Sequence, residues 1–479
     1  MRRNILFLTL LTTVLLSTMS FAQSTVNTPA PRPAGQAASV GRATPSKKEN
    51  SPFSKDRLQR IDRVMQQYVD ENRLAGAVAL VLRDGRPVYE RAFGWSDKEA
   101  GQRMTTDTIF RIASQTKAIT SAAILSLVEQ GKIVLTDPVS RFIPEFAKTT
   151  VAQGKDSAGA VVPAKRQITI KDLLTHTAGI SYGTQPNVAS LYEAKGLGPA
   201  AGNGWYTADK KEGICRTMER LASLPFIAQP GESWVYGYNT DILGCVVERA
   251  AGVPLDQFIR TQITDPLGMK DTQFYLPIRQ RQRLAAVYAS GSDGLITRAP
   301  EGSKGQGDYV NGPRQSYAGG AGLLSTAHDY ARFLEMIRNG GALDGVRILS
   351  PRAVKLMTTN QIGNLAPEEG LGFGLGFQTT DRFGASGLAP VGAFGWGGAY
   401  GTVYSVDPEA RLVMVLIQPC QPEQDNRQSF PDSGLSGSCR TREVNDHAVL
   451  PSHLRQPISG QLYSSRVLNR VVRYRIRAP

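Results

Sequence analysis

The chain has 479 residues, of which 41% are hydrophobic and 20% are charged. This composition is typical of a globular protein with a full core, and it excludes collagen-like and wholly disordered classes. The formal net charge of +14 lies largely at the two ends of the chain, so we expect no nucleic-acid partner for the mildly basic middle.

The N-terminus resembles an export signal. Arg2 and Arg3 precede an apolar run over residues 5–16, which is followed by small residues up to Ala22. A basic start, a short apolar stretch and small residues predict a signal peptide over residues 1–22. The run is too short to span a bilayer. There is also no cysteine near the cleavage point, which argues against a lipid anchor. We therefore expect a periplasmic or secreted bacterial protein without a membrane anchor.

The next segments predict a linker and then the start of a folded domain. Residues 23–52 are rich in Pro, Ala, Ser and Thr, which is typical of a flexible linker. A helix is predicted from Arg57 onward, because apolar residues then recur at helical spacing. The extended apolar runs 77–82 and 87–93 flank Asp84-Gly85, a strong signal for a β-hairpin.

Helices dominate the middle of the chain, and strands return near its end. Residues 113–130 read as an apolar, central helix that ends at Gly131. A second capped helix is predicted over 325–336, and two antiparallel strands over 402–406 and 412–418.

This order predicts a mixed α/β fold of the α+β type, in which one antiparallel sheet flanked by helices is built from both ends of the chain. We expect one domain over 53–418, with a sheet lobe at about 53–112 and 275–418 and an inserted helical lobe at about 113–274. Residues 419–479 are rich in Ser, Arg, Gln and Pro and are predicted to be an atypical, disordered tail.

Four cysteines occur, namely Cys215, Cys245, Cys420 and Cys439. They show neither Cys-x-x-Cys spacing nor local pairing with histidine, so we expect no metal site and no redox motif. Export permits a disulfide, but the sequence does not choose a pairing, and free thiols are the favoured interpretation. No cofactor is expected.

The first candidate for chemistry is Ser114-Gln-Thr-Lys117 at the start of the central helix. Residues three apart share a helical face, so the hydroxyl and the amine can meet. Apolar neighbours favour a neutral lysine that can act as a base. A Ser-x-x-Lys match is expected about once by chance in such a chain, and the alternative is a lysine whose ammonium reaches solvent.

The second candidate is the segment with Tyr236, Tyr238 and Asn239. A phenol near a lysine can accept and return a serine proton, although an aromatic cluster packed under a loop is the commoner arrangement. Tyr238 and Asn239 are predicted to bind substrate.

The third candidate is Trp396-Gly397-Gly398-Ala399, which leads into a strand. Glycines allow a backbone to approach a ligand closely, and an amide at a strand edge can help form an oxyanion hole. The alternative is a glycine-rich turn. Other hydrolase designs fit less well, and His176 is interpreted as a residue that fixes a loop.

Taken together, these segments resemble the penicillin-recognising serine hydrolases, in particular the group similar to class C β-lactamases, over about residues 57–418. The phrases Ile-Phe-Arg-Ile-Ala-Ser-Gln-Thr-Lys, Leu-Leu-Thr-His-Thr-Ala-Gly and Asp-Pro-Leu-Gly-Met-Lys-Asp-Thr add to the motifs. The resemblance implies Ser114 as nucleophile, Lys117 and Tyr236 as its proton-transfer partners, and the amides of Ser114 and Ala399 as the oxyanion hole.

Two departures affect the expected substrate. Tyr238 stands where the family has the Asn of Tyr-x-Asn, with Asn239 one step later, and Trp396-Gly397-Gly398 replaces Lys-Thr-Gly. The Trp-Gly-Gly form is similar to that of family VIII carboxylesterases, which implies an esterase acting on small neutral acyl esters.

Two alternatives remain open. One is a β-lactamase or D-alanyl-D-alanine carboxypeptidase, and the other is a non-catalytic, penicillin-binding-like module of the cell wall. The oligomeric state is not predicted.

Overall fold

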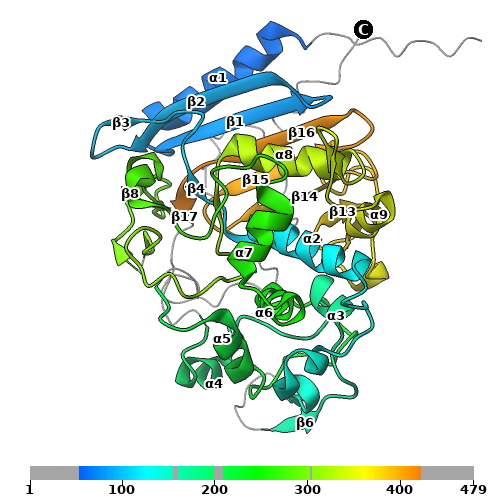
Figure 1. Ribbon diagram of the computed structural model, residues 1–479. Helices are drawn as coiled ribbons and strands as arrows, with labels where there is room; N and C mark the ends of the chain where they lie inside the picture. The colour runs from blue at the N-terminus through cyan, green and yellow to red at the C-terminus, as the bar shows by residue number, and fades with distance from the viewer. Residues whose placement is uncertain (1–52, 155–159, 199–208, 303–304, 422–479) are drawn as a thin grey trace, which may run out of the picture. The chain divides into compact units, whose positions relative to one another are not determined.

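The computed structural model describes residues 53–154, 160–198, 209–302 and 305–421 (Figure 1). The predicted signal peptide and linker, and the tail beyond residue 421, lie outside this part of the chain.

The core of the fold is an eight-stranded antiparallel sheet in the order β12-β13-β14-β15-β16-β1-β2-β3. Its first and last segments meet in the middle, where Val78 of β1 pairs with Ile417 of β16. The predicted sheet made from both ends of the chain is thereby confirmed. Its strands are β1 (Gly76–Arg83), β2 (Arg86–Asp97), β3 (Gln102–Arg103), β12 (Leu371–Phe373), β13 (Gln378–Thr380), β14 (Phe394–Gly398), β15 (Thr402–Asp407) and β16 (Leu412–Ile417).

The predicted hairpin joins β1 to β2. Asp84 and Gly85 both have positive φ, of 52° and 72°, and Arg83 pairs with Arg86 across the turn. Two consecutive left-handed residues match the right-handed twist of the flanking strands, which explains the choice of Asp-Gly.

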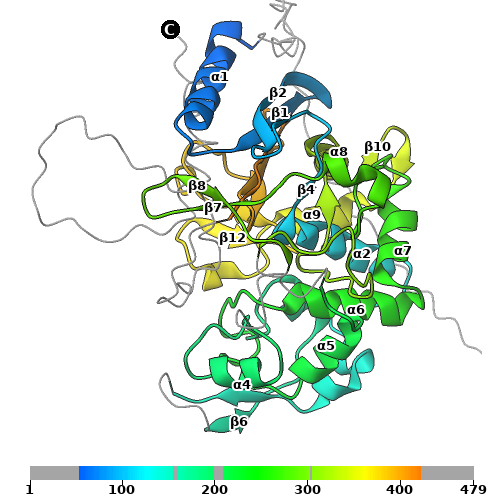
Figure 2. The same cartoon turned by 90° about the vertical axis from the view of Figure 1, so that its left-hand side faces the viewer.

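Helices cover both faces of the sheet, as Figures 1 and 2 show. Successive residues of β1 point to opposite faces. Ala77 and Ala79 pack in one cluster with Ile61 and Met65 of helix α1 (Lys55–Asp70). Val78 and its alternate neighbours pack in the main core, which also holds α2 and α8. Alternation along a single strand therefore separates the two layers.

Helix α2 (Thr116–Glu129) lies in the main core, against α6 (Asn239–Ala251). A short 3-10 turn, η1 (Ala113–Gln115), precedes it, so the helix predicted over 113–130 begins as a tighter turn. Gly131, with φ of +71°, follows its last turn.

The remaining described elements lie around these two layers. The helices are α3 (Ile170–Leu174), α4 (Ala189–Ala194), α5 (Ile214–Leu221), α7 (Leu255–Ile259), α8 (Ala327–Arg338) and α9 (Pro351–Thr358). The short helical turns are η2 (Val139–Arg141), η3 (Pro144–Ala147), the π-helical η5 (Arg260–Thr264), η6 (Ile278–Arg283) and η8 (Gly363–Leu365). The minor strands are β4 (Phe110–Arg111), β5 (Thr150–Ala152), β6 (Val161–Pro163), β7 (Tyr288–Ser290), β8 (Ile296–Arg298), β9 (Leu324–Ser325), β10 (Ala342–Leu343), β11 (Val346–Arg347) and β17 (Cys420–Gln421).

The expectation of free thiols is wrong. Cys215 of α5 and Cys245 of α6 form a disulfide, and no cysteine among the described residues is a free thiol. The two half-cystines are 30 residues apart in the sequence, and only the packing of α5 on α6 brings them together. Sequence spacing therefore could not predict this pairing.

Folded chain also continues past residue 418. Cys420 and Gln421 form β17, which pairs in parallel with β7 at Tyr288 and Ala289. Among the described residues, no helix is long and apolar enough to cross a membrane.

Candidate active site

Ser114 lies in a tight turn between strand β4 and helix α2. Ala113 before it has φ of +42°, a conformation that is unusual for a residue with a Cβ. The following residues hold the turn in place, since the Oγ1 of Thr116 accepts a hydrogen bond from the amide of Leu323 at 3.1 Å. Ser114 itself is 8% exposed, which leaves its hydroxyl at the edge of the buried core.

The structure brings Lys117 to Ser114, as the spacing predicted. The Nζ of Lys117 lies 3.1 Å from the Oγ of Ser114 and also donates to the carbonyl of Gly320 at 2.7 Å. The side chain is 2% exposed, and it forms no ion pair with any carboxylate of the described chain. Its partners are neutral oxygens, so it is free to exchange a proton with the serine.

Sequence reasoning missed a further partner of this lysine, Tyr182. The Nζ of Lys117 lies 3.1 Å from the hydroxyl of Tyr182. Tyr182 follows the Leu-Leu-Thr-His-Thr-Ala-Gly stretch in the sequence, but no spacing rule connects it with a residue sixty-five positions earlier. Its contact with Lys117 depends on the path of the loop after α3.

Asp241 lies behind the Ser114–Lys117 pair. Its Oδ1 accepts the amide of Gly320 at 3.0 Å, and the carbonyl of the same glycine accepts from Lys117. Burial raises the pKa of Asp241 to about 6, although the charge of Lys117 acts in the opposite direction. The carboxylate therefore orients the peptide group that holds the lysine.

Tyr236 lies beside the pair, but its hydroxyl is not bonded to either group. The Nζ of Lys117 is 4.7 Å from the ring centroid of Tyr236, a cation–π distance. The hydroxyl is buried and has no hydrogen-bond partner among the described residues. A buried phenol without a partner is costly, which is consistent with a group kept available for proton transfer.

Two loops fix the place of Tyr236. The amide of Val235 donates to the carbonyl of His176 at 2.7 Å, and a Cβ on Gly237 would stand 2.3 Å from the carbonyl of Ile180. The Tyr236 loop therefore lies directly on the segment 176–180, and a larger residue at 237 would push it away.

His176, Asn239 and Tyr238 are buried beneath this loop. The Nδ2 of Asn239 lies 2.9 Å from the Nδ1 of His176, and the hydroxyl of Tyr238 accepts the amide of Gly198 at 2.9 Å. Asn239 and Tyr238 have no exposed surface. Burial, followed by the charge of Lys117, holds the pKa of His176 well below its usual range. The contacts of His176 and Asn239 support the Tyr236 loop from below, as expected for His176. Tyr238 and Asn239 are fully buried and therefore do not face solvent.

The Trp-Gly-Gly segment forms strand β14 and ends beside the serine turn. A Cβ on Gly398 would stand 2.4 Å from the carbonyl of Ile112, so this strand end approaches the backbone just before Ser114. Ala399 packs on a small cluster that includes Ala113. The two predicted oxyanion-hole residues are thus neighbours in the fold.

Trp396 belongs to an aromatic cluster around Tyr236. Its ring centroid lies 5.6 Å from that of Tyr236 and 5.3 Å from that of Phe373, and Trp234 stacks on Tyr236 at 5.8 Å. The Nε1 atoms of Trp234 and Trp396 are buried without a partner in the described chain. The surroundings of the site are therefore apolar, with a few unused donors.

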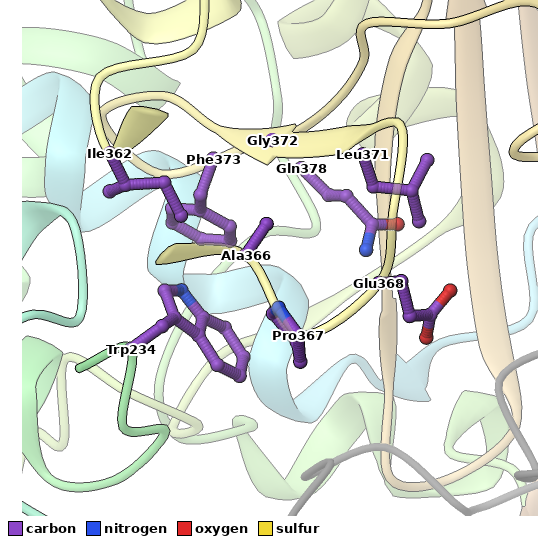
Figure 3. A pocket seen from close by; sticks show the side chains of 9 residues that line it. All are labelled: Trp234, Ile362, Ala366, Pro367, Glu368, Leu371, Gly372, Phe373 and Gln378. Atoms are coloured by element: carbon purple, nitrogen blue, oxygen red, sulfur yellow. The ribbon is translucent and has the colours of Figure 1, made fainter. Parts of the chain in front are cut away.

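The cluster adjoins a small pocket between the loop around Pro367 and strand β12 (Figure 3). Trp234 and Phe373 line it, but Ser114 does not. The pocket therefore lies beside the reacting groups and does not contain them.

Comparisons with known proteins identify the relatives of this chain. A family model described as Beta-lactamase matches residues 61–429. Esterase EstB of Burkholderia gladioli is 35% identical over 75% of this chain and 89% of its own length. A putative D-alanyl-D-alanine carboxypeptidase of Escherichia coli K12 is 29% identical over 81% and 88%.

Among solved structures, EstCE1, described as a hydrolase with promiscuous acyltransferase activity, superimposes with a TM-score of 0.64 at 28% identity, covering 76% of this chain and 94% of its own. The family model spans most of the folded domain, and the match to EstB extends over 75% of this chain at 35% identity. The chain therefore belongs to the Beta-lactamase family and is a serine hydrolase.

Proposed function

We propose that the protein is an exported esterase that hydrolyses small neutral acyl esters through an acyl-enzyme on Ser114. The observation that carries this proposal is the 3.1 Å contact between Lys117 and Ser114 within a site that has an apolar tryptophan at position 396. A cation at that position would bind the carboxylate of a β-lactam or a D-alanyl peptide, whereas Trp396 offers apolar surface and one N–H donor.

In the first half-reaction, the Oγ of Ser114 attacks the ester carbonyl carbon and passes its proton to Lys117 or Tyr236. The amides of Ser114 and Ala399 stabilise the negative charge on the carbonyl oxygen. The bond from carbonyl carbon to alcohol oxygen then breaks, and the alcohol leaves with the proton. The Tyr236 hydroxyl is suited to return that proton because no other group engages it.

In the second half-reaction, water attacks the acyl carbon, the bond to the Oγ of Ser114 breaks, and the carboxylic acid leaves. Ser114 recovers a proton, so the enzyme is unchanged after one turnover. The same side chains and amides act in both half-reactions, so the proposed mechanism uses no cofactor.

A substrate panel tests the proposal. Purified protein should hydrolyse p-nitrophenyl butyrate much faster than nitrocefin, and Ser114→Ala should lose both activities while keeping its Tm. Fast turnover of nitrocefin with inert esters would instead favour a β-lactamase or carboxypeptidase, the alternative suggested by the name of the E. coli relative.

A fluorophosphonate probe separates catalysis from a pure binding role. Covalent labelling that is absent in Ser114→Ala would support the esterase. Folded protein that resists the probe and all esters would favour a non-catalytic cell-wall module.

Export is tested by mass spectrometry of the mature N-terminus. We expect the mature chain to begin after residue 22, because residues 1–22 resemble a signal peptide.

A further inference from the structure

Three residues before Ser114, the chain buries an arginine, Arg111 of strand β4. Arg111 is 5% exposed, and within the described residues it forms no ion pair with a carboxylate. Taking a charged group out of water without an opposite charge beside it is costly. Neither the nucleophile nor its proton-transfer partners explain why the chain buries this charge.

The guanidinium of Arg111 bonds two backbone carbonyls. Its Nε donates to the carbonyl of Gln306 and its Nη1 to that of Ala285, both at 2.6 Å. The ring of Tyr309 lies against the same group, with its centroid 5.3 Å from the Cζ of Arg111, a cation–π distance. A planar guanidinium holds two acceptors in a fixed geometry. Arg111 therefore ties its own strand to the chain between Ala285 and Gln306.

Gln306 extends this anchor to two further residues, Val287 and Ala299. Its Oε1 accepts the amide of Val287 at 2.9 Å, and its Nε2 donates to the carbonyls of Val287 at 2.9 Å and Ala299 at 3.0 Å. Gln306 is buried, so losing one of these bonds would leave a polar group unsatisfied in the interior. The bonds of Arg111 and Gln306 together hold the backbone of Val287 and Ala299 in place relative to strand β4.

The proposed oxyanion hole packs on these two residues. Val287 and Ala299 form one buried cluster with Ala113 and Tyr400, and Ala399 packs against it. Ala113 has its φ of +42° directly before the nucleophile, and Ala399 supplies the second amide of the proposed oxyanion hole. The residues that place both amides therefore contact the cluster whose backbone is held by the two buried side chains.

From these contacts we propose that Arg111, acting through Gln306, is a positioning residue for the oxyanion hole. Its two hydrogen bonds hold the cluster that keeps Ala113 in its left-handed conformation and Ala399 beside it. They thereby set the spacing of the two amides that stabilise the negative charge on the carbonyl oxygen. Arg111 takes no part in proton transfer. The inference rests on the proposed acyl-enzyme mechanism and adds a residue to it.

The test compares catalysis with the binding of a transition-state mimic. Arg111→Met removes both donors and keeps an extended side chain, and Gln306→Met removes the bonds to Val287 and Ala299 while Arg111 stays. Hydrolysis of p-nitrophenyl butyrate gives kcat/KM. Phenylboronic acid forms a tetrahedral adduct with an active-site serine, and its inhibition constant Ki reports on the oxyanion hole. We expect kcat/KM to fall about 10- to 100-fold in both variants, as when catalytic groups are slightly misplaced, and Ki to rise by the same factor.

A second buried arginine, Arg338, provides the matched control. Its Nε donates to the carboxylate of Glu335 at 2.8 Å at the end of helix α8. This pair lies at the hairpin between β1 and β2, since a Cβ on Gly85 would stand 3.1 Å from the Glu335 carboxylate. Arg338→Met leaves a buried carboxylate unpaired, so it should lower the Tm. We expect it to retain the wild-type kcat/KM and Ki.

The variant Arg111→Lys separates the two hydrogen bonds from the charge. A lysine restores the positive charge, but its single amine on a flexible stem does not hold two carbonyls as a guanidinium does. We expect it to recover little of the lost kcat/KM. Full recovery would refute the anchor on two carbonyls.

The outcomes separate this inference from the proposed function. Parallel losses of kcat/KM and boronate affinity in Arg111→Met and Gln306→Met, with both retained in Arg338→Met, support the positioning role. Unchanged boronate affinity in either variant, or an equal loss in Arg338→Met, refutes it and leaves the esterase intact. If Arg111→Met does not fold, the same criteria apply to Gln306→Met and Arg111→Lys. Wild type that neither hydrolyses the ester nor binds the boronate would refute the proposed function, and the inference with it.

Discussion

The Nζ of Lys117 lies 3.1 Å from the hydroxyl of Tyr182, whereas the lysine meets Tyr236 through its ring face, 4.7 Å from the centroid. Two phenols therefore flank one lysine in different ways. One hydroxyl is engaged by the amine, and the other is buried and unengaged. The two contacts imply different roles in proton transfer.

Removing each hydroxyl separately should distinguish these roles. We expect Tyr236→Phe to lower kcat by about 10²–10⁴-fold, the usual effect of losing a general acid–base group. Tyr182→Phe removes only one partner of Lys117, so kcat should fall by no more than about tenfold. Steady-state kinetics with p-nitrophenyl butyrate give both values. The opposite ranking would make Tyr182 the proton carrier.

The end of strand β14 gives a test of the oxyanion hole. In Gly398→Ala, the new Cβ would stand 2.3 Å from the Oγ1 of Thr402 and 2.4 Å from the carbonyl of Ile112, so the strand must move away from the serine turn. We expect kcat to fall by about 10²–10³-fold, as when one oxyanion donor is lost.

Gly397→Ala is the matched control for that change. Its added Cβ would meet only the carbonyl of Thr402, at 3.2 Å, and we expect a much smaller loss of kcat. Equal losses in the two variants would show that close approach to Ile112 is not what matters. The Tm of each variant separates misfolding from misplacement.

The disulfide between Cys215 and Cys245 should stabilise the helical lobe. Replacing both residues by alanine removes a cross-link that closes a loop of about thirty residues, for which the chain-entropy model predicts a loss of about 3–4 kcal/mol in unfolding free energy. Urea denaturation measures it. Because the cross-link lies on α5 and α6, we expect kcat at low temperature to change little, and thiol titration of the denatured wild type checks that the bond forms.

His176 should make the protein less stable in acid. Its pKa is lowered in the folded state, so below pH about 6.5 the unfolded chain takes up a proton that folded His176 does not. The free energy of unfolding then falls by at most about 1.4 kcal/mol per pH unit from this group. His176→Gln should flatten this fall between pH 6.5 and 5, as urea denaturation at several pH values would reveal.

Asp241 should change the stability with pH in the opposite direction to His176. Its pKa is raised to about 6 in the folded state, so between pH about 4 and 6 the folded protein holds a proton that the unfolded chain has lost, and stability from this group decreases as the pH rises. The unfolding free energy of wild type relative to Asp241→Asn should therefore decline from pH 4 to 7. A difference that stays constant with pH would mean that Asp241 is ionised throughout.

Sequence motifs predicted the structure correctly where the backbone geometry of a few consecutive residues determines it. The spacing of Ser114 and Lys117 places both on one helical face, and the Asp84-Gly85 pair supplies the two left-handed residues that its hairpin needs. These features follow from backbone geometry over a few residues, and the structure has both. The resemblance to a known family added the fold and the class of chemistry.

Contacts between distant loops could not be read in the same way. The contact of Tyr182 with Lys117 and the bond between Cys215 and Cys245 each join segments whose separation follows no period. Their meeting depends on how helices pack and where loops cross the sheet, which is a property of the whole core. The sequence thus indicated the serine–lysine pair, and the family resemblance added Tyr236. The contact of Lys117 with Tyr182 and the adjoining pocket were decided by tertiary packing.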